Sequence, residues 1–224
     1  AENNYVNSYS LSTPYDLSTA SFVNNFNILN ESGNATWETS DVGLSPDGTK
    51  MYVVSAGNRA LYQYTLGTAF NVATATYDGV SWQDTSPRSP AASRVRVYGG
   101  TLLAVYENQK YVVTHSISGH NFSTVSADTT SELDTTAHFS GFPADAEFAE
   151  DGTVLYVLEK TSDSLHRFTL STPYDLSTAV YADCGPIDFS GSLNDVQGFW
   201  LVGEDTRCYV STITGNSIYD FTLG

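Results

Sequence analysis

The most constraining feature of this sequence is a ten-residue segment that occurs twice. Residues 11–20 are LSTPYDLSTA, and residues 170–179 carry the same ten letters 159 positions later, which is three times 53. Two weaker copies lie between them, LGTAFNVATA from Leu66 and ISGHNFSTV from Ile117. A period of this length indicates one supersecondary unit copied several times along the chain.

Two further markers have the same period. Tight-turn signals, of which SPDGT is the clearest, end at Thr49, Thr101, Thr153 and Thr206, spaced 52, 52 and 53 residues apart. A strand end with an aromatic or histidine residue recurs at Tyr9, Tyr64, His115, Phe168 and Phe221. Three markers with one period predict a repeat architecture.

Each repeat has the pattern of four short antiparallel strands. In the first, residues 41–44, 50–55, 60–66 and 75–81 are rich in the Val, Tyr and Thr that favour strands, and Pro46-Asp47-Gly48 is a hairpin turn. No segment has a sustained helical period. We therefore expect an all-β fold, a four-bladed β-propeller of about 53-residue, four-stranded antiparallel repeats.

The repeats fill one predicted domain, residues 1–224. The expected units are approximately 12–66, 67–117, 118–170 and 171–223, preceded by an extra N-terminal strand at residues 4–11. Fourth strands are expected near residues 20–28, 75–82, 123–130 and 178–188. The chain thus has five third strands for four blades, and we expect one terminal strand to pair with a neighbouring subunit or the chain to belong to a longer array.

Charge excludes some partners. The chain has 25 acidic and 9 basic residues, a net charge of −16, which repels nucleic acid and anionic membranes. The sequence has no run of 18 apolar residues, so it predicts no membrane-spanning helix. The acidic surface favours solubility in extracellular water or a cationic partner. The start at Ala1, without Met or a signal peptide, is expected of a mature secreted or trimmed protein.

The two cysteines, Cys184 and Cys208, leave two alternatives open. A single disulfide between them fits an acidic, Ser/Thr-rich β-protein, and two buried free thiols are the other interpretation. Three N-x-S/T sequons, at Asn30, Asn34 and Asn121, are candidate glycosylation sites if the source glycosylates its proteins.

One candidate metal site follows from the repeat. Asp41 and Asp145 each lie eight residues before the turn threonine, Ser93 takes that position in the second unit, and Asp195 matches it in the fourth if an insertion near residues 199–202 is allowed. First strands line the channel of a propeller. These carboxylates therefore form a candidate Ca²⁺ ring, or else each bonds backbone amides of the neighbouring blade. No other cofactor is indicated.

Enzyme motifs are absent from the sequence. It contains no G-x-S-x-G, H-E-x-x-H, C-x-x-C or Walker pattern. Nothing places two histidines and a carboxylate at metal-ligand spacing. We therefore expect no catalytic residues, which leaves an enzymatic role open but unsupported.

The motifs SPDGTKMYVVS, LYQYTLGT and STPYDLSTA resemble repeats of uncharacterised β-propeller proteins of bacteria and tailed phages, which are distantly similar to YVTN and lactonase-type propellers. The resemblance covers nearly the whole chain and implies a propeller fold, but it supplies no matched set of active-site residues. It implies an extracellular or virion-surface location.

Two function classes follow. The first is a non-catalytic structural or adhesive module of a fibre, phage appendage or cell surface, which self-associates through terminal strands and binds glycan or protein ligands. The second is a lactonase-like propeller enzyme, or a glycan-binding lectin, with a metal in the central channel. The missing catalytic set favours the first, because a fold alone does not specify a function.

Overall fold

The computed structural model describes residues 5–28, 39–55, 60–82, 92–126, 130–182, 187–202, 207–215 and 217–223. Within these ranges the chain is all-β, with antiparallel strands joined by turns, single-turn 3-10 helices and no α-helix. The repeats predict this class, and the structure confirms it.

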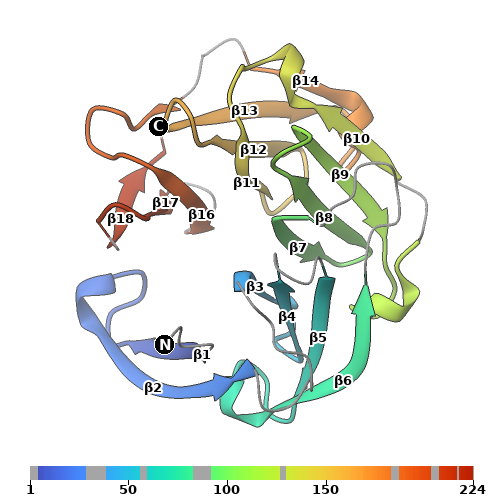
Figure 1. The fold of residues 1–224 in the computed structure, drawn as a ribbon, viewed down its shortest axis with the longest axis vertical. Helices are drawn as coiled ribbons and strands as arrows, with labels where there is room; N and C mark the ends of the chain where they lie inside the picture. The colour runs from blue at the N-terminus through green and yellow to red at the C-terminus, as the bar shows by residue number, and fades with distance from the viewer. Residues whose placement is uncertain are drawn as a thin grey trace. The chain divides into compact units, whose positions relative to one another are not determined.

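Four blades follow one another along the chain, and the fold is a four-bladed β-propeller (Figure 1). Blade one contains β3 (Thr39–Leu44), β4 (Lys50–Ser55), β5 (Ala60–Leu66) and β6 (Ala75–Trp82). Blade two contains β7 (Arg94–Tyr98), β8 (Thr101–Tyr106), β9 (Tyr111–Ser116) and β10 (Ser131–Asp134). Blade three contains β11 (Pro143–Phe148), β12 (Val154–Glu159), β13 (Ser164–Leu170), β14 (Ala179–Tyr181) and β15 (Ile187–Asp188). Blade four contains β16 (Val196–Val202), β17 (Arg207–Thr212) and β18 (Ser217–Thr222).

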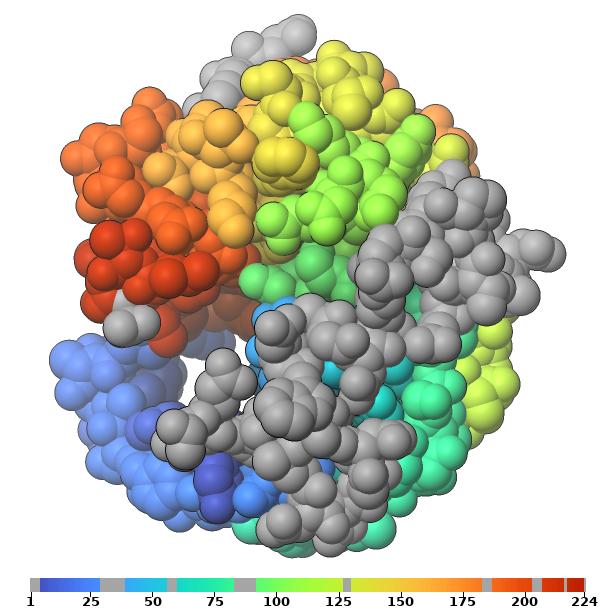
Figure 2. Space-filling model, in the orientation of Figure 1, coloured from blue at the N-terminus to red at the C-terminus, as the bar shows by residue number. Residues whose placement is uncertain are grey.

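The extra N-terminal strand predicted from the repeats is present. It is β1 (Tyr5–Leu11), which pairs antiparallel with β2 (Ala20–Asn27) in a separate two-stranded sheet. By their place in the repeat these are a third and a fourth strand. Side chains of this hairpin form part of the molecular surface in Figure 2 (blue).

By internal contacts the chain divides into two compact units. The first contains Ala1–Leu102 and Ile117–Ser126, and the second contains Leu103–Ser116 and Ala127–Gly224. In the first unit, Phe26 and Ile28 of the hairpin region pack with Met51, Val53 and Tyr64 of blade one. In the second, side chains of blades three and four share a core that includes Leu158, Leu165, Phe199, Cys208 and Val210. Each unit therefore buries the face of one sheet against the next.

The SPDGT segment is built as its residue types predict. The Asp47 Oδ1 atom accepts hydrogen bonds from the Ser45 hydroxyl and from the Thr49 amide and hydroxyl, at 2.6, 3.0 and 2.8 Å. These bonds hold the pKa of Asp47 well below its usual value. Since the carboxylate form is the one that is bonded, this contribution to stability is present above pH about 4 and is lost in stronger acid.

The repeated corner LSTPYDLSTA has a local explanation. Asp16, Asn71, Asn121 and Asp175 each cap a single 3-10 turn by accepting a bond from the amide two residues later. The residue before each cap has a positive φ: Tyr15, Phe70, His120 and Tyr174, at 62°, 61°, 54° and 62°. The 3-10 turns η3 (Val72–Thr74), η4 (Phe122–Thr124) and η6 (Leu176–Thr178) contact β2, β6 and β10, the outer strands of the preceding sheets.

One boundary predicted from the sequence is wrong. The fourth strand of blade two is β10 at Ser131–Asp134, not residues 123–130. The reason is the corner itself, because Asn121 caps η4 and the Thr124 hydroxyl donates to the Asn121 carbonyl oxygen at 2.6 Å, which keeps residues 121–124 in a turn. Residues 127–129 lie outside the described residues.

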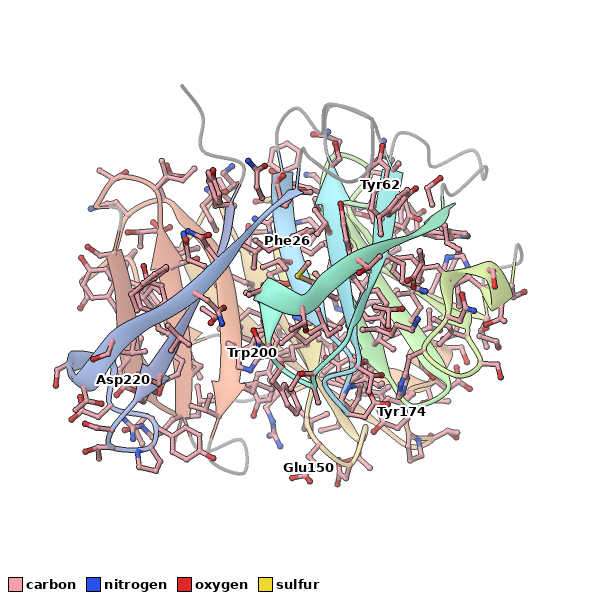
Figure 3. The ribbon with its side chains drawn as sticks, turned by 90° about the horizontal axis from the view of Figure 1, so that it is seen from below. Phe26, Tyr62, Glu150, Tyr174, Trp200 and Asp220 are labelled. Carbon is pink, nitrogen blue, oxygen red and sulfur yellow. The ribbon has the colours of Figure 1, made fainter. Side chains whose placement is uncertain are left out.

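In two of the corners, at Phe70 and at Tyr174, the aromatic residue covers the glycine of a hairpin turn. The Phe70 amide donates to the Gly48 carbonyl oxygen, and the Tyr174 amide donates to that of Gly152, both at 2.9 Å. Tyr174 lies beside Glu150 at one edge of the second unit, where its hydroxyl donates to the Glu150 carbonyl oxygen at 3.0 Å (Figure 3). A Cβ atom on Gly48 would lie 2.5 Å from the Phe70 ring.

This contact gives a prediction for two glycines that both have positive φ. Gly79→Ala, where nothing lies within 4 Å of the added Cβ, should cost about 1–2 kcal/mol from backbone strain alone. Gly48→Ala should cost roughly 3 kcal/mol or more, because the overlap with Phe70 adds to that strain. Urea denaturation measures both, and equal losses would contradict the proposed packing.

Candidate functional site

The candidate site lies on the first strands of the blades. In β3, β11 and β16 the pairing with the second strand shifts register at one place, between Thr39 and Asp41, Pro143 and Asp145, and Val196 and Gly198. A bulge re-aims the side chain that follows it. The bulge therefore recurs in the repeat and sets the direction of the side chain at the Asp41 and Asp145 positions.

Both aspartates bond the backbone of the next first strand. The Asp41 Oδ2 atom accepts from the Val95 amide at 3.2 Å, and the Asp145 Oδ2 atom accepts from the Phe199 amide at 3.1 Å. In each, Oδ1 accepts from the amide of the following residue at 2.9 Å. The bonded residues lie 54 positions apart in both pairs, so the same link joins β3 to β7 and β11 to β16.

Charge around the two carboxylates differs. Asp41 also accepts from Arg96 at 2.7 Å, in an ion pair whose side chains are largely buried. Asp145 is buried, and Glu147, two residues later in β11, accepts from the Leu201 amide at 2.9 Å. Sequence analysis missed Glu147. Its position two residues after Asp145 was the available signal, because residues i and i+2 share one face of a strand.

Asp195 does not occupy the equivalent position, and this alignment is corrected. The register of β16 on β17 places Gly198 where Asp41 and Asp145 stand, 53 residues after Asp145, so no insertion is needed near residues 199–202. Asp195 lies just before β16 with a φ of 63° and accepts from the Gln197 side chain at 2.8 Å. A Cβ on Gly198 would lie 3.4 Å from the Asp145 Oδ2 atom, so a larger residue would crowd that carboxylate.

Among the described residues, no group of three or more His, Cys, Asp or Glu side chains has an arrangement that would hold a metal ion. In the first unit, the Ser93 carbonyl oxygen accepts a hydrogen bond from the Ser40 hydroxyl at 3.2 Å. The first strands are thus linked by polar contacts at several points, and calcium at Asp41, Asp145 and Asp195 stays a prediction.

Cys208 is buried in the core of the second unit. Burial, aided by the negative charges of Asp220 and Glu147, raises the pKa of its thiol to about 12. Its expected partner, Cys184, lies outside the described residues, and the disulfide stays a prediction.

Of the three sequons, Asn30 and Asn34 lie outside the described residues. The Asn121 side-chain oxygen accepts from the Ser123 amide at 3.0 Å as the cap of η4. Glycosylation at these asparagines stays a prediction.

Comparisons with known proteins support the fold alone. No protein-family model matches the chain, and no curated protein matches it. A solved structure of a protein from Lactobacillus plantarum is similar, with a TM-score of 0.57 and 12% identity over 99% of this chain and 64% of the other.

Two similar structures are lactonase-like. A Bacteroides fragilis protein provisionally assigned as a 6-phosphogluconolactonase has a TM-score of 0.57 and 12% identity over 99% of this chain and 61% of its own. The Pseudomonas aeruginosa periplasmic gluconolactonase PpgL has a TM-score of 0.55 and 15% identity over 98% of this chain and 62% of its own. The chain thus spans less than two thirds of the length of these structures. At such identities the likeness is one of fold. In the described part of the chain, no helix is long and apolar enough to cross a membrane.

A calcium titration tests the predicted ring. Binding at the first strands should raise the melting temperature in millimolar CaCl₂ over that in EDTA, because a ligand that binds the native state stabilises it. Asp145→Asn should abolish the shift, and Asp151→Asn, in an exposed hairpin turn, should not. An equal melting temperature in the two solutions would assign these carboxylates to backbone bonding alone.

Proposed function

We propose that this chain is a non-catalytic structural or adhesive propeller module of an extracellular or virion-surface assembly, of the kind found in the bacterial and phage repeat proteins that it resembles. In this proposal copies associate head to tail, with β18 of one copy beside β1 of the next. The open outer side of β18 is the observation that carries the proposal.

The sheet of blade four ends at β18 in the described part of the chain, in the order β16-β17-β18. In the other three blades a fourth strand pairs with the third on this side. Ile218 occupies the register position of Leu61 and Leu165, which are 1% exposed, yet Ile218 is 60% exposed. The edge and one face of β18 are therefore available for another strand.

The N-terminal hairpin offers a matching edge. β1 is a third strand by its place in the repeat, and within the described residues it pairs with β2 alone. Tyr9 and Phe22 meet edge to face at 5.8 Å on this hairpin, and both are more than half exposed. Pairing of β18 with β1 would continue the antiparallel alternation and give a sheet in the order β16-β17-β18-β1-β2.

β1 carries no charged residue or Pro, and the one charged residue of β18, Asp220, pairs with Arg207 of β17. β1 is YVNSYSL and β18 is SIYDFT, with no Lys, Arg or Pro in either strand. Edge strands that must stay single are commonly protected by such residues. A heterologous contact of this kind builds an open filament unless its rotation closes a ring.

A lactonase-like enzyme, or a lectin with a channel metal, is the alternative function. The likeness to PpgL and to the Bacteroides protein favours it only at the level of fold. Hydrolysis of gluconolactone by the purified chain, lost on removal of a metal, would support the enzyme and oppose the structural role.

Assembly is testable with point variants of the full chain. We expect concentration-dependent oligomers in sedimentation velocity and filaments in electron microscopy, more of both at higher salt because the net charge of −16 opposes association. Ile218→Lys and deletion of residues 1–11 should each shift the protein to monomer.

Ile213→Lys is the matched control, since Ile213 is 56% exposed but lies in the turn before β18. It should leave the oligomers unchanged. A full chain that stays monomeric at all concentrations, or that has the same oligomer distribution as the truncated form, would refute the proposal.

A further inference from the structure

A buried polar network lies in blade three, within the second unit. The imidazole of His166 on β13 contacts Glu159 of β12 through Nε2, at 2.9 Å from Oε2, and the Tyr181 hydroxyl of β14 through Nδ1, at 2.8 Å. Glu159 and His166 are both 4% exposed, and Tyr181 is half-buried. A carboxylate, an imidazole and a hydroxyl thus stand in series, from the interior toward the surface.

The carboxylate of Glu159 accepts hydrogen bonds from three donors. Besides His166, the Gly141 amide donates to Oε1 at 2.7 Å and the Ser162 hydroxyl donates to Oε2 at 2.5 Å. A side chain at position 141 would overlap Oε1, so glycine is required for this approach.

The same contacts set the state of the imidazole. Because the carboxylate can only accept, Nε2 carries the proton, and the Nδ1 lone pair is directed at the Tyr181 hydroxyl. Burial lowers the pKa of His166, against the opposing effect of Glu159, so the ring is neutral at pH 7. Phe139 stacks on His166 at 4.2 Å and His138 stacks on Tyr181 at 5.4 Å, which fixes both rings.

The repeat itself does not require this network. Strand pairing places Ser55, Tyr62 and Tyr77 of blade one at the positions of Glu159, His166 and Tyr181. In blade one Tyr62 and Tyr77 meet as two rings, 6.0 Å apart. Blade three therefore keeps a tyrosine at this position. In place of Tyr62 it has a base, His166, and in place of Ser55 it has a carboxylate, Glu159, that orients this base.

We propose that Tyr181 is a nucleophilic site that accepts acyl groups from small activated acyl donors. A nucleophile bonded to a base that is itself oriented by a third group is the arrangement that activates hydroxyl side chains. In the reaction with N-acetylimidazole, a bond forms between the Tyr181 oxygen and the acetyl carbon while the carbon–nitrogen bond of the reagent breaks. The phenolic proton passes to His166 Nδ1 and from there to the departing imidazole. The site is independent of the strand edges that carry the proposed function.

The experiment compares Tyr181 with Tyr77, a half-buried tyrosine at the same place in blade one whose pKa burial raises. The native full chain is treated with N-acetylimidazole at pH 7, and acetylation of each tyrosine is followed by peptide mass spectrometry. We expect Tyr181 to react on the order of tenfold faster than Tyr77, a modest share of what general-base assistance can supply.

Two variants separate chemistry from structure. The double variant Glu159→Ser, His166→Tyr rebuilds blade one's residues, which fit this register, and should lower the Tyr181 rate to that of Tyr77. Glu159→Gln, which keeps the shape, should lower it several-fold. Equal rates for Tyr181 and Tyr77 in the native protein, or an unchanged Tyr181 rate in the double variant at an unchanged Tyr77 rate, would overturn the proposal. Neither outcome depends on whether copies of the chain associate.

Discussion

The bond from a first-strand carboxylate to a backbone amide of the next first strand is the interaction on which the blade arrangement depends. In the described ranges, strands within a blade have a backbone ladder, and no such ladder joins the strands of successive blades. Asp41 with Val95, and Asp145 with Phe199, supply the same directional bond between the first strands of successive blades. Hydrogen bonds to charged groups contribute about 1.5–3 kcal/mol each, more than neutral ones. A buried carboxylate such as Asp145 is stable only because its donors are in place.

The corners complete this arrangement at the outer side of the sheets. Each capped 3-10 turn is closed by its own Asp or Asn and Thr, so its shape does not depend on its surroundings. The shape then presents one residue to the preceding blade. Phe122 stacks on Tyr52 at 4.6 Å and its amide bonds the Gln63 side chain at 2.7 Å, while the Leu176 amide bonds the Ser131 hydroxyl at 2.9 Å.

Sequence was sufficient for the features that depend on local chemistry. The Pro-Asp-Gly turn, the capped corners and the extra strand β1 follow from residue types at one period. Features that depend on strand register were not accessible. The match of Asp195 has a different cause, because it assumed an insertion, whereas Gly198 lies eight residues before Thr206, the same spacing that Asp41 and Asp145 have from their turn threonines. Glu159, His166 and Tyr181 are 7 and 15 residues apart in sequence and meet only through the pairing of three strands.

The same distinction applies to function. The repeats predict a scaffold, and chemistry on such a scaffold depends on the few positions where one blade departs from the others. Blade three departs at Glu159 and His166, and blade four departs at the open side of β18. The candidate functional positions are therefore found by comparing the repeats of this chain with one another.

The most direct test of the blade-to-blade account is the unfolding free energy of Asp145→Ala. Loss of this carboxylate leaves the buried amide of Phe199 without its acceptor, and we expect a cost of about 2–4 kcal/mol. Asp220→Ala, which removes an exposed ion pair with Arg207 in the same unit, should cost less than about 1 kcal/mol. Equal losses for the two variants in urea denaturation would contradict the account.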